Sequence, residues 1–219
     1  MTAPIDTARL NQLLLAAERD VHRHGWDAPA QLLALVDTTN PGAEHWCQHG
    51  AHGPTTQVDG YAAARCIPWQ RLVVQPMHVL FRIALNLRHS ADRPETAQMR
   101  RLLHPPGMIG LASVLEAWIR PTLTEQQEEE QWGERAAVDI PGAQECRLAV
   151  AATIDGATFH VARIRGQHPT ATGNSRFDGI GGTGVHALHT MVAAATGRPL
   201  PPDTDKVPIG WDWDKELAE

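Results

Sequence analysis

A tract rich in histidine and cysteine, residues 45–52, is the part of the sequence best suited to bind a metal. Imidazole and thiolate are the ligands that zinc prefers, and a metal can order a loop that lacks its own apolar core. The candidate ligands are His45, Cys47, His49, His52 and Cys66. Their spacing matches no standard zinc motif, so a surface loop with scattered histidines is the alternative interpretation. Because these ligands suffice to close the coordination shell, a bound zinc would be structural.

A second candidate is the glycine pattern formed by Gly179, Gly181 and Gly184, which precedes a predicted helix. Glycines let the backbone approach a phosphate, and a helix N-terminus offers free N–H groups to an anion. The spacing is that of the dinucleotide-binding fingerprint, but the preceding predicted strand ends near Arg165, well before the first glycine. A plain loop entering the helix is therefore the alternative to an anion or nucleotide site.

His186 and His189 lie three residues apart in the same predicted helix and therefore on one face. They could ligate a metal or share a proton, although no third ligand is identifiable; a pair at the edge of the core is the alternative. The sequence contains no Gly-x-Ser-x-Gly elbow, no His-Glu-x-x-His, no phosphate-binding loop with Gly-Lys-Ser/Thr and no Cys-x-x-Cys. A non-enzymatic role is favoured on this ground.

The last residues, 200–219, form a tail rich in proline and aspartate that carries Trp211 and Trp213. Tryptophan offers a large contact area and is enriched where proteins meet. The tail is therefore predicted to bind a partner protein, and docking on the protein's own surface is the alternative.

The 219 residues, 42% of them hydrophobic and 20% charged, suffice for one domain with a sizeable core. A net charge of −6 argues against a general affinity for nucleic acids or anionic lipids. The odd number of cysteines, three, fits a reducing compartment. No secretory signal and no apolar run of about 20 residues is visible, so we expect a cytoplasmic protein without a membrane span.

The clearest predicted element is an amphipathic helix that begins after Asp6 or Thr7 and ends near His24. Its apolar side comprises Leu10, Leu13, Leu14, Ala17 and Val21, and its polar side Arg9, Glu18, Arg19 and Arg23. Further helices are predicted over residues 76–89, 90–103, 125–135 and 185–196, and strands over 32–36 and 71–74. Residues 108–119 alternate like a strand but also suit a helix, and the strand is favoured.

Residues 147–165 are predicted to form a β-hairpin around Asp155-Gly156, a dipeptide typical of turns in which both central residues have positive φ. Pairing outward from this turn sets Ile154 opposite Ala157, Ala152 opposite Phe159 and Val150 opposite Val161. These six apolar side chains would then share one face of the sheet, which implies that a helix covers it.

Together these elements predict an α+β fold, an antiparallel β-sheet that includes the 147–165 hairpin and is covered by helices at both chain ends. Residues 1–199 form the single domain and 200–219 the tail. Residues 38–66, rich in Gly, His, Thr and Pro without sustained periodicity, are predicted to be a long irregular insertion.

Residues 21–36, VHRHGWDAPAQLLALV, resemble the GWD-x-P-x-x-L-x-A-L opening of a small uncharacterised actinobacterial protein family. The segment HPPGMIGLASVLEAWIRP is similar to that family's WPD-x-x-x-G-x-A-L strand, and the hairpin and closing helix resemble its C-terminal half. The chain departs from the family in residues 38–103, which are expanded, and in the tail. The resemblance implies a bacterial cytoplasmic domain and transfers no catalytic residue.

The function expected from the sequence is that of a non-enzymatic intracellular interaction or accessory protein. Its partner is expected to be a protein that contacts the tail, residues 38–66, or both. The alternative is a zinc-stabilised or anion- or nucleotide-binding domain, which could be an enzyme.

Overall fold

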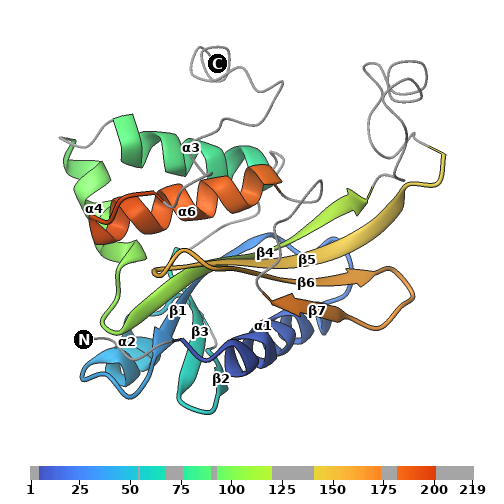
Figure 1. The fold of residues 1–219 in the computed structure, drawn as a ribbon, viewed down its shortest axis with the longest axis horizontal. Coiled ribbons are helices and arrows are strands. Elements are labelled where there is room, and N and C mark those ends of the chain that lie inside the picture. Colours follow the sequence, from blue (N-terminus) through green and yellow to red (C-terminus); the bar gives the residue numbers. More distant parts are fainter. Residues whose placement is uncertain are drawn as a thin grey trace.

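The computed structural model describes residues 5–53, 55–67, 76–89, 93–119, 141–173 and 182–200. They form an α+β fold in which one antiparallel sheet lies between helix α1 and a layer made by α3 and α6 (Figure 1). The described helices are α1 Thr7–His22, α2 Ala43–His49, α3 Pro76–His89, α4 Pro94–Leu103 and α6 Gly182–Thr196. The strands are β1 Gln31–Asp37, β2 Thr56–Val58, β3 Tyr61–Arg65, β4 Met108–Ile119, β5 Gln144–Thr153, β6 Thr158–Ile164 and β7 Thr170–Gly173. The predicted fold class is confirmed.

The seven strands follow the order β2-β3-β1-β4-β5-β6-β7, and all neighbours pair antiparallel. Strand β1 reads QLLALVD and is buried on both faces, as a continuous apolar run predicts. It pairs with β4, where Gly110 lies opposite Leu35. A Cβ atom at Gly110 would come within 2.5 Å of the Ala152 carbonyl oxygen, so only glycine fits at this point of the β4–β5 ladder.

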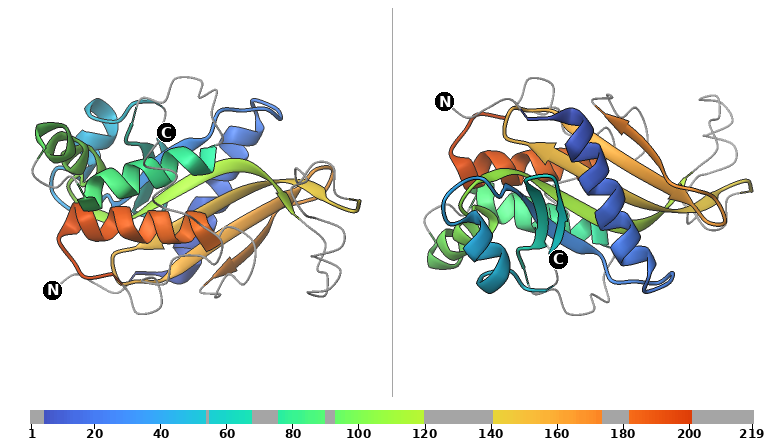
Figure 2. Two further views of the ribbon diagram at one scale, coloured as in Figure 1. Left: turned by 90° about the horizontal axis from the view of Figure 1, so that it is seen from above. Right: turned by 90° about the horizontal axis from the view of Figure 1, so that it is seen from below.

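Helix α1 packs along one face of the sheet, as the view from below shows (Figure 2). The Asp6 carboxylate caps its N-terminus by accepting hydrogen bonds from the backbone of Ala8 and Arg9, at 3.0 and 3.2 Å. The apolar side of α1 packs on alternate residues of the central strands. This core contains Leu10, Leu13, Leu14, Ala17, Val21, Leu33, Leu35, Ala63, Ala112, Val114, Ala149, Ala151, Phe159 and Val161.

Helices α3 and α6 lie side by side on the opposite face (Figure 2). The second core between these helices and the sheet includes Leu80, Ala84, Leu87, Leu188, Met191, Val192, Leu32, Ala34, Val36, Leu111, Leu148 and Val150. The sheet is therefore covered by helices from both ends of the chain. Alternate residues of each strand point to opposite faces of the sheet and so belong to different cores. Strand β4, Met108–Ile119, confirms the strand that was predicted over residues 108–119.

Residues 38–66 are not the irregular insertion expected from the sequence. They contain α2 and the β2–β3 hairpin, which extends the sheet next to β1. The periodicity was invisible because α2 has only seven residues and β3 reads YAAAR, whose alanines lack the β-branched signal of most strands. Ala62 and Ala64 have no exposed surface, so this segment belongs to the core.

The register of the β5–β6 hairpin differs by one residue from the prediction. Ala151 lies opposite Phe159 and Ala149 opposite Val161. The reason is the turn: Gly156 has φ +88°, whereas Asp155 is not in the positive-φ region, so the two-residue turn does not form. Instead, Thr153 N donates to Ala157 O at 3.0 Å across a longer connection. Phe159 and Val161 consequently face α1, and Val150 faces α3 and α6.

The predicted strand over 71–74 and helix over 125–135 lie outside the described residues. Within the described part of the chain, no helix is both long and apolar enough to cross a membrane.

Candidate functional site

The five candidate zinc ligands are separated by the geometry of α2. Residues two apart on a helix point to nearly opposite sides, so Cys47 is buried while His45 and His49 are exposed. The two histidine rings lie 4.6 Å apart on the outer face, and His52 is exposed in the following loop. Among the described residues, no three of these five bring their ligand atoms within 4.8 Å of one another.

Both cysteines of this set belong to the core on the α3–α6 side of the sheet. The Cys66 thiol donates to the Leu32 carbonyl oxygen at 3.5 Å, and burial raises its pKa to about 12. Burial, and secondly the charge of Glu44, raise the pKa of Cys47. Neither thiol is poised to become the thiolate that zinc requires.

Of the three glycines proposed to hold an anion, only Gly184 is described, and it is the third residue of α6. Gly184 faces the sheet and lines a small apolar cavity of about 10 Å³ with Leu115 and Leu188. Gly179 and Gly181 lie outside the described residues, as do Trp211 and Trp213 of the tail.

His186 and His189 lie on the buried side of α6, with 6% and 2% of their surface exposed. The His189 Nε2 atom lies 2.9 Å from the Thr158 hydroxyl of β6. Desolvation first, and the neighbouring His186 second, lower the pKa of His189 to about 4. At neutral pH His189 is therefore an uncharged core residue that connects α6 to the sheet.

A buried charge network on the α1 face was missed by the sequence analysis. Glu18, assigned to the polar side of the helix, has no exposed surface and accepts two hydrogen bonds from Arg163. These bonds, at 2.6 and 2.7 Å, raise the pKa of Arg163. The sequence did contain a signal for this network. Arg147 shares a strand face with Ala149, and Arg163 shares one with Val161. A charge on a buried face needs a partner.

The turn after α1 is held by Arg147, which is entirely buried. Its Nη2 atom donates to the Gly25 carbonyl oxygen and to Glu116, both at 2.5 Å. Two guanidinium groups lie over the Trp26 ring, with the Arg147 and Arg165 Cζ atoms 4.8 and 5.1 Å from its centre. The Gly-Trp-Asp segment, residues 25–27, is thus fixed to β4 and β5.

Carboxylate oxygens of Asp27, Glu116 and Glu145 lie within 4.8 Å of one another beside this turn. Two of the three already have cationic partners, because Glu116 accepts from Arg147 and Glu145 from Arg165. Glu116 also accepts from the Asp27 backbone N–H at 2.8 Å. The arrangement stabilises the turn, and its chemistry is that of a structural ion-pair network.

A groove with a volume of about 220 Å³ lies between α3 and α4. Ile83, Leu87 and Met99 form its apolar floor, whereas Asn86 and the exposed Arg93 belong to its rim. Glu95 and Thr96 complete the lining. An Arg100 Nη2–H group donates to the Leu87 carbonyl oxygen at 3.0 Å, so this contact fixes α4 against the end of α3.

The groove lining carries one exposed cation, Arg93, and one exposed carboxylate, Glu95, and further arginines lie elsewhere on the same two helices. Residues 82–101 contain five arginines against Asp92 and Glu95, although the whole chain has a net charge of −6. Among the described residues, no carboxylate lies within 4.0 Å of Arg82, Arg88, Arg93 or Arg101. These cations therefore differ from Arg147 and Arg163, whose charges are neutralised inside the fold.

No family model, curated protein or solved structure matches this chain.

Proposed function

We propose that this is a non-enzymatic accessory protein that binds an acidic, aromatic-containing segment of a partner protein in the α3–α4 groove. The observation that carries the proposal is the combination of an apolar floor with Arg93, an exposed cation that no described carboxylate approaches within 4.0 Å. Large apolar anchors surrounded by complementary charge are the usual basis of protein recognition.

The size of the groove favours a side-chain anchor over a metabolite. Small-molecule sites usually enclose about 300–1,000 Å³, whereas this groove offers about 220 Å³. Its described lining contains no cysteine, serine or histidine, and its polar side chains are Asn86, Arg93, Glu95 and Thr96. A partner segment can place a large aromatic side chain on the apolar floor and a neighbouring carboxylate near the Arg93 guanidinium.

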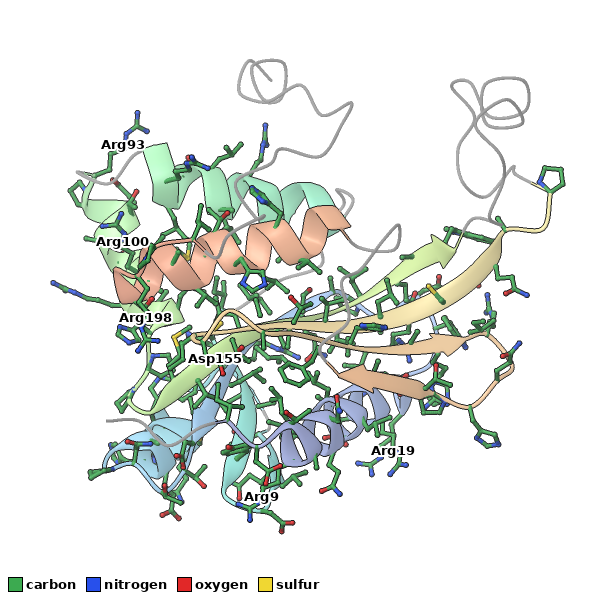
Figure 3. All side chains as sticks on the ribbon, viewed as in Figure 1. Arg9, Arg19, Arg93, Arg100, Asp155 and Arg198 are labelled. Carbon is green, nitrogen blue, oxygen red and sulfur yellow. The ribbon has the colours of Figure 1, made fainter. Side chains whose placement is uncertain are left out.

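Panning a displayed random-peptide library on the immobilised full-length chain tests this function. We expect enrichment of peptides that combine Trp or Phe with Asp or Glu. Their affinity is expected to fall at least tenfold for the Arg93→Glu variant and to stay unchanged for Arg19→Glu, a matched exposed arginine on α1 across the sheet (Figure 3). Equal binding of the enriched peptides to both variants would exclude the proposed function.

A further inference from the structure

We infer that residues 209–214 of this chain, Ile-Gly-Trp-Asp-Trp-Asp, occupy the α3–α4 groove intramolecularly and compete there with the partner. The inference rests on the proposed function, because it names a ligand for the same groove. Three properties of the described residues carry it: the chemistry of the groove, the place where α6 ends, and the length of chain beyond it.

The first property is complementarity. The groove combines the apolar side chains of Ile83, Leu87 and Met99 with the exposed cation of Arg93, and the exposed Glu95 also belongs to its lining. The segment alternates tryptophan with aspartate, so a ring on the floor leaves a carboxylate next to it for the arginine. From Asp203 onward the tail has six acidic residues against two lysines, opposite in sign to residues 82–101.

The second property is position. Helix α6 contacts both α3 and α4. Arg198, immediately after α6, lies at the α4 end of that helix, on the same side as Arg100 (Figure 3). Its guanidinium donates to the Ile154 carbonyl oxygen at 2.8 Å, which fixes the point from which the tail departs.

The third property is reach. Ten residues lie between Leu200 and Trp211, and the eleven Cα-to-Cα steps that join the two can span up to about 40 Å. Helix α6, with 15 residues, is about 22 Å long, so the segment reaches any point of the α3–α4 layer. A tether of this kind gives an effective concentration on the order of 1 mM. An affinity of only about 0.1 mM for the free peptide would then favour the docked form roughly tenfold.

Photo-cross-linking in the full-length chain tests the inference directly. With Trp213→p-benzoylphenylalanine, we expect cross-links within one chain to residues 83–99, identified by mass spectrometry after proteolysis. The yield is expected to fall at least fivefold when Arg93→Glu is added and to be unchanged with Arg19→Glu. Cross-links elsewhere on the chain, cross-links only at the mass of two chains, or no cross-links would overturn it.

The proposed function and this inference can fail separately. If the tail competes, peptides selected by panning should bind about tenfold more tightly to the Trp211→Ala, Trp213→Ala double variant than to the unmodified chain. Equal affinity for the two chains means that the groove binds partners but not the tail, and the inference alone is then lost. An absence of selected peptides even on the double variant removes the groove function itself.

Discussion

Glu18 on α1 and Arg163 on β6 face each other as a two-point ion pair, although 145 residues separate them in the sequence. The pair connects the helix to the sheet inside the protein, where Glu18 has no exposed surface. The Nη1 atom of Arg147 lies 3.9 Å from the same carboxylate. One acidic group therefore compensates charges contributed by two different strands, which makes this position sensitive to substitution.

Replacing Glu18 with alanine is expected to lower the free energy of unfolding by about 3–5 kcal/mol, because it leaves the buried Arg163 without its carboxylate partner. Urea denaturation monitored by circular dichroism measures the loss. Arg23→Ala is the control: it removes the exposed pair with Asp20 on the same helix and should cost about 0.2–1 kcal/mol. Similar losses in both variants would contradict a special role for Glu18.

Trp26→Ala is expected to destabilise the protein by about 1–3 kcal/mol, since each stacked guanidinium contributes roughly 0.5–2 kcal/mol. Hydrogen exchange should also become faster at the Asp27 amide, which Glu116 now holds. Trp118, 39% exposed, offers a comparison: its replacement by alanine should change stability by less than about 0.5 kcal/mol. A loss of stability for Trp118→Ala that equals or exceeds the loss for Trp26→Ala would contradict the prediction.

Acid should weaken the fold through His189. Because its pKa is lowered to about 4 in the folded chain and is about 6.5 when unfolded, the unfolded state binds the proton first. The resulting stability is present above pH 6.5 and is lost as the pH falls toward 4. Between pH 7 and pH 5 this group alone should cost about 2 kcal/mol.

The measurement is urea denaturation at both pH values for the unmodified chain, His189→Gln and the exposed-site control His52→Gln. The control should retain the full pH dependence, and His189→Gln should lose about 2 kcal/mol of it. An unchanged pH dependence in His189→Gln would show that other groups are responsible.

The three cysteines should resist thiol reagents in the folded protein. All are buried, and burial raises the pKa of Cys66 to about 12 and of Cys146 to about 11. At pH 8 less than about one in a hundred of these two thiols is then ionised, and reagents react with the thiolate. A colorimetric disulfide reagent should count three thiols in urea and almost none without it. His52→Cys supplies a fast-reacting reference, and a native cysteine reacting at that rate would refute the expectation.

Sequence patterns predicted the elements whose burial is local and periodic. Helix α1 and strand β1 are examples, because every position of their apolar pattern packs against the neighbouring layer. The β5–β6 register was wrong by one residue, since the turn depends on the φ of Asp155 and not on its identity alone. The short β3 was missed because alanines carry little strand signal.

The sites were less predictable than the fold. Cys47 and His49 looked like ligands of one metal in the linear sequence, but the helical turn between them points one inward and the other outward. Conversely, the helical pattern placed Glu18 on the solvent side of α1, whereas in the folded protein it accepts a hydrogen bond from Arg163 of the sheet. The α3–α4 groove depends on how two helices meet, which no local pattern specifies.

The long separation between Glu18 and Arg163 has a consequence during synthesis on the ribosome. At about 5–20 residues per second, roughly 7–30 s pass between the addition of the two residues. For most of that interval the growing chain contains α1 and β1 but neither Arg163, which pairs with Glu18, nor Arg147, which holds the turn at Trp26. Helix α1 in the N-terminal third of the chain therefore cannot complete its core on this face of the sheet until the β5–β6 hairpin has been synthesised.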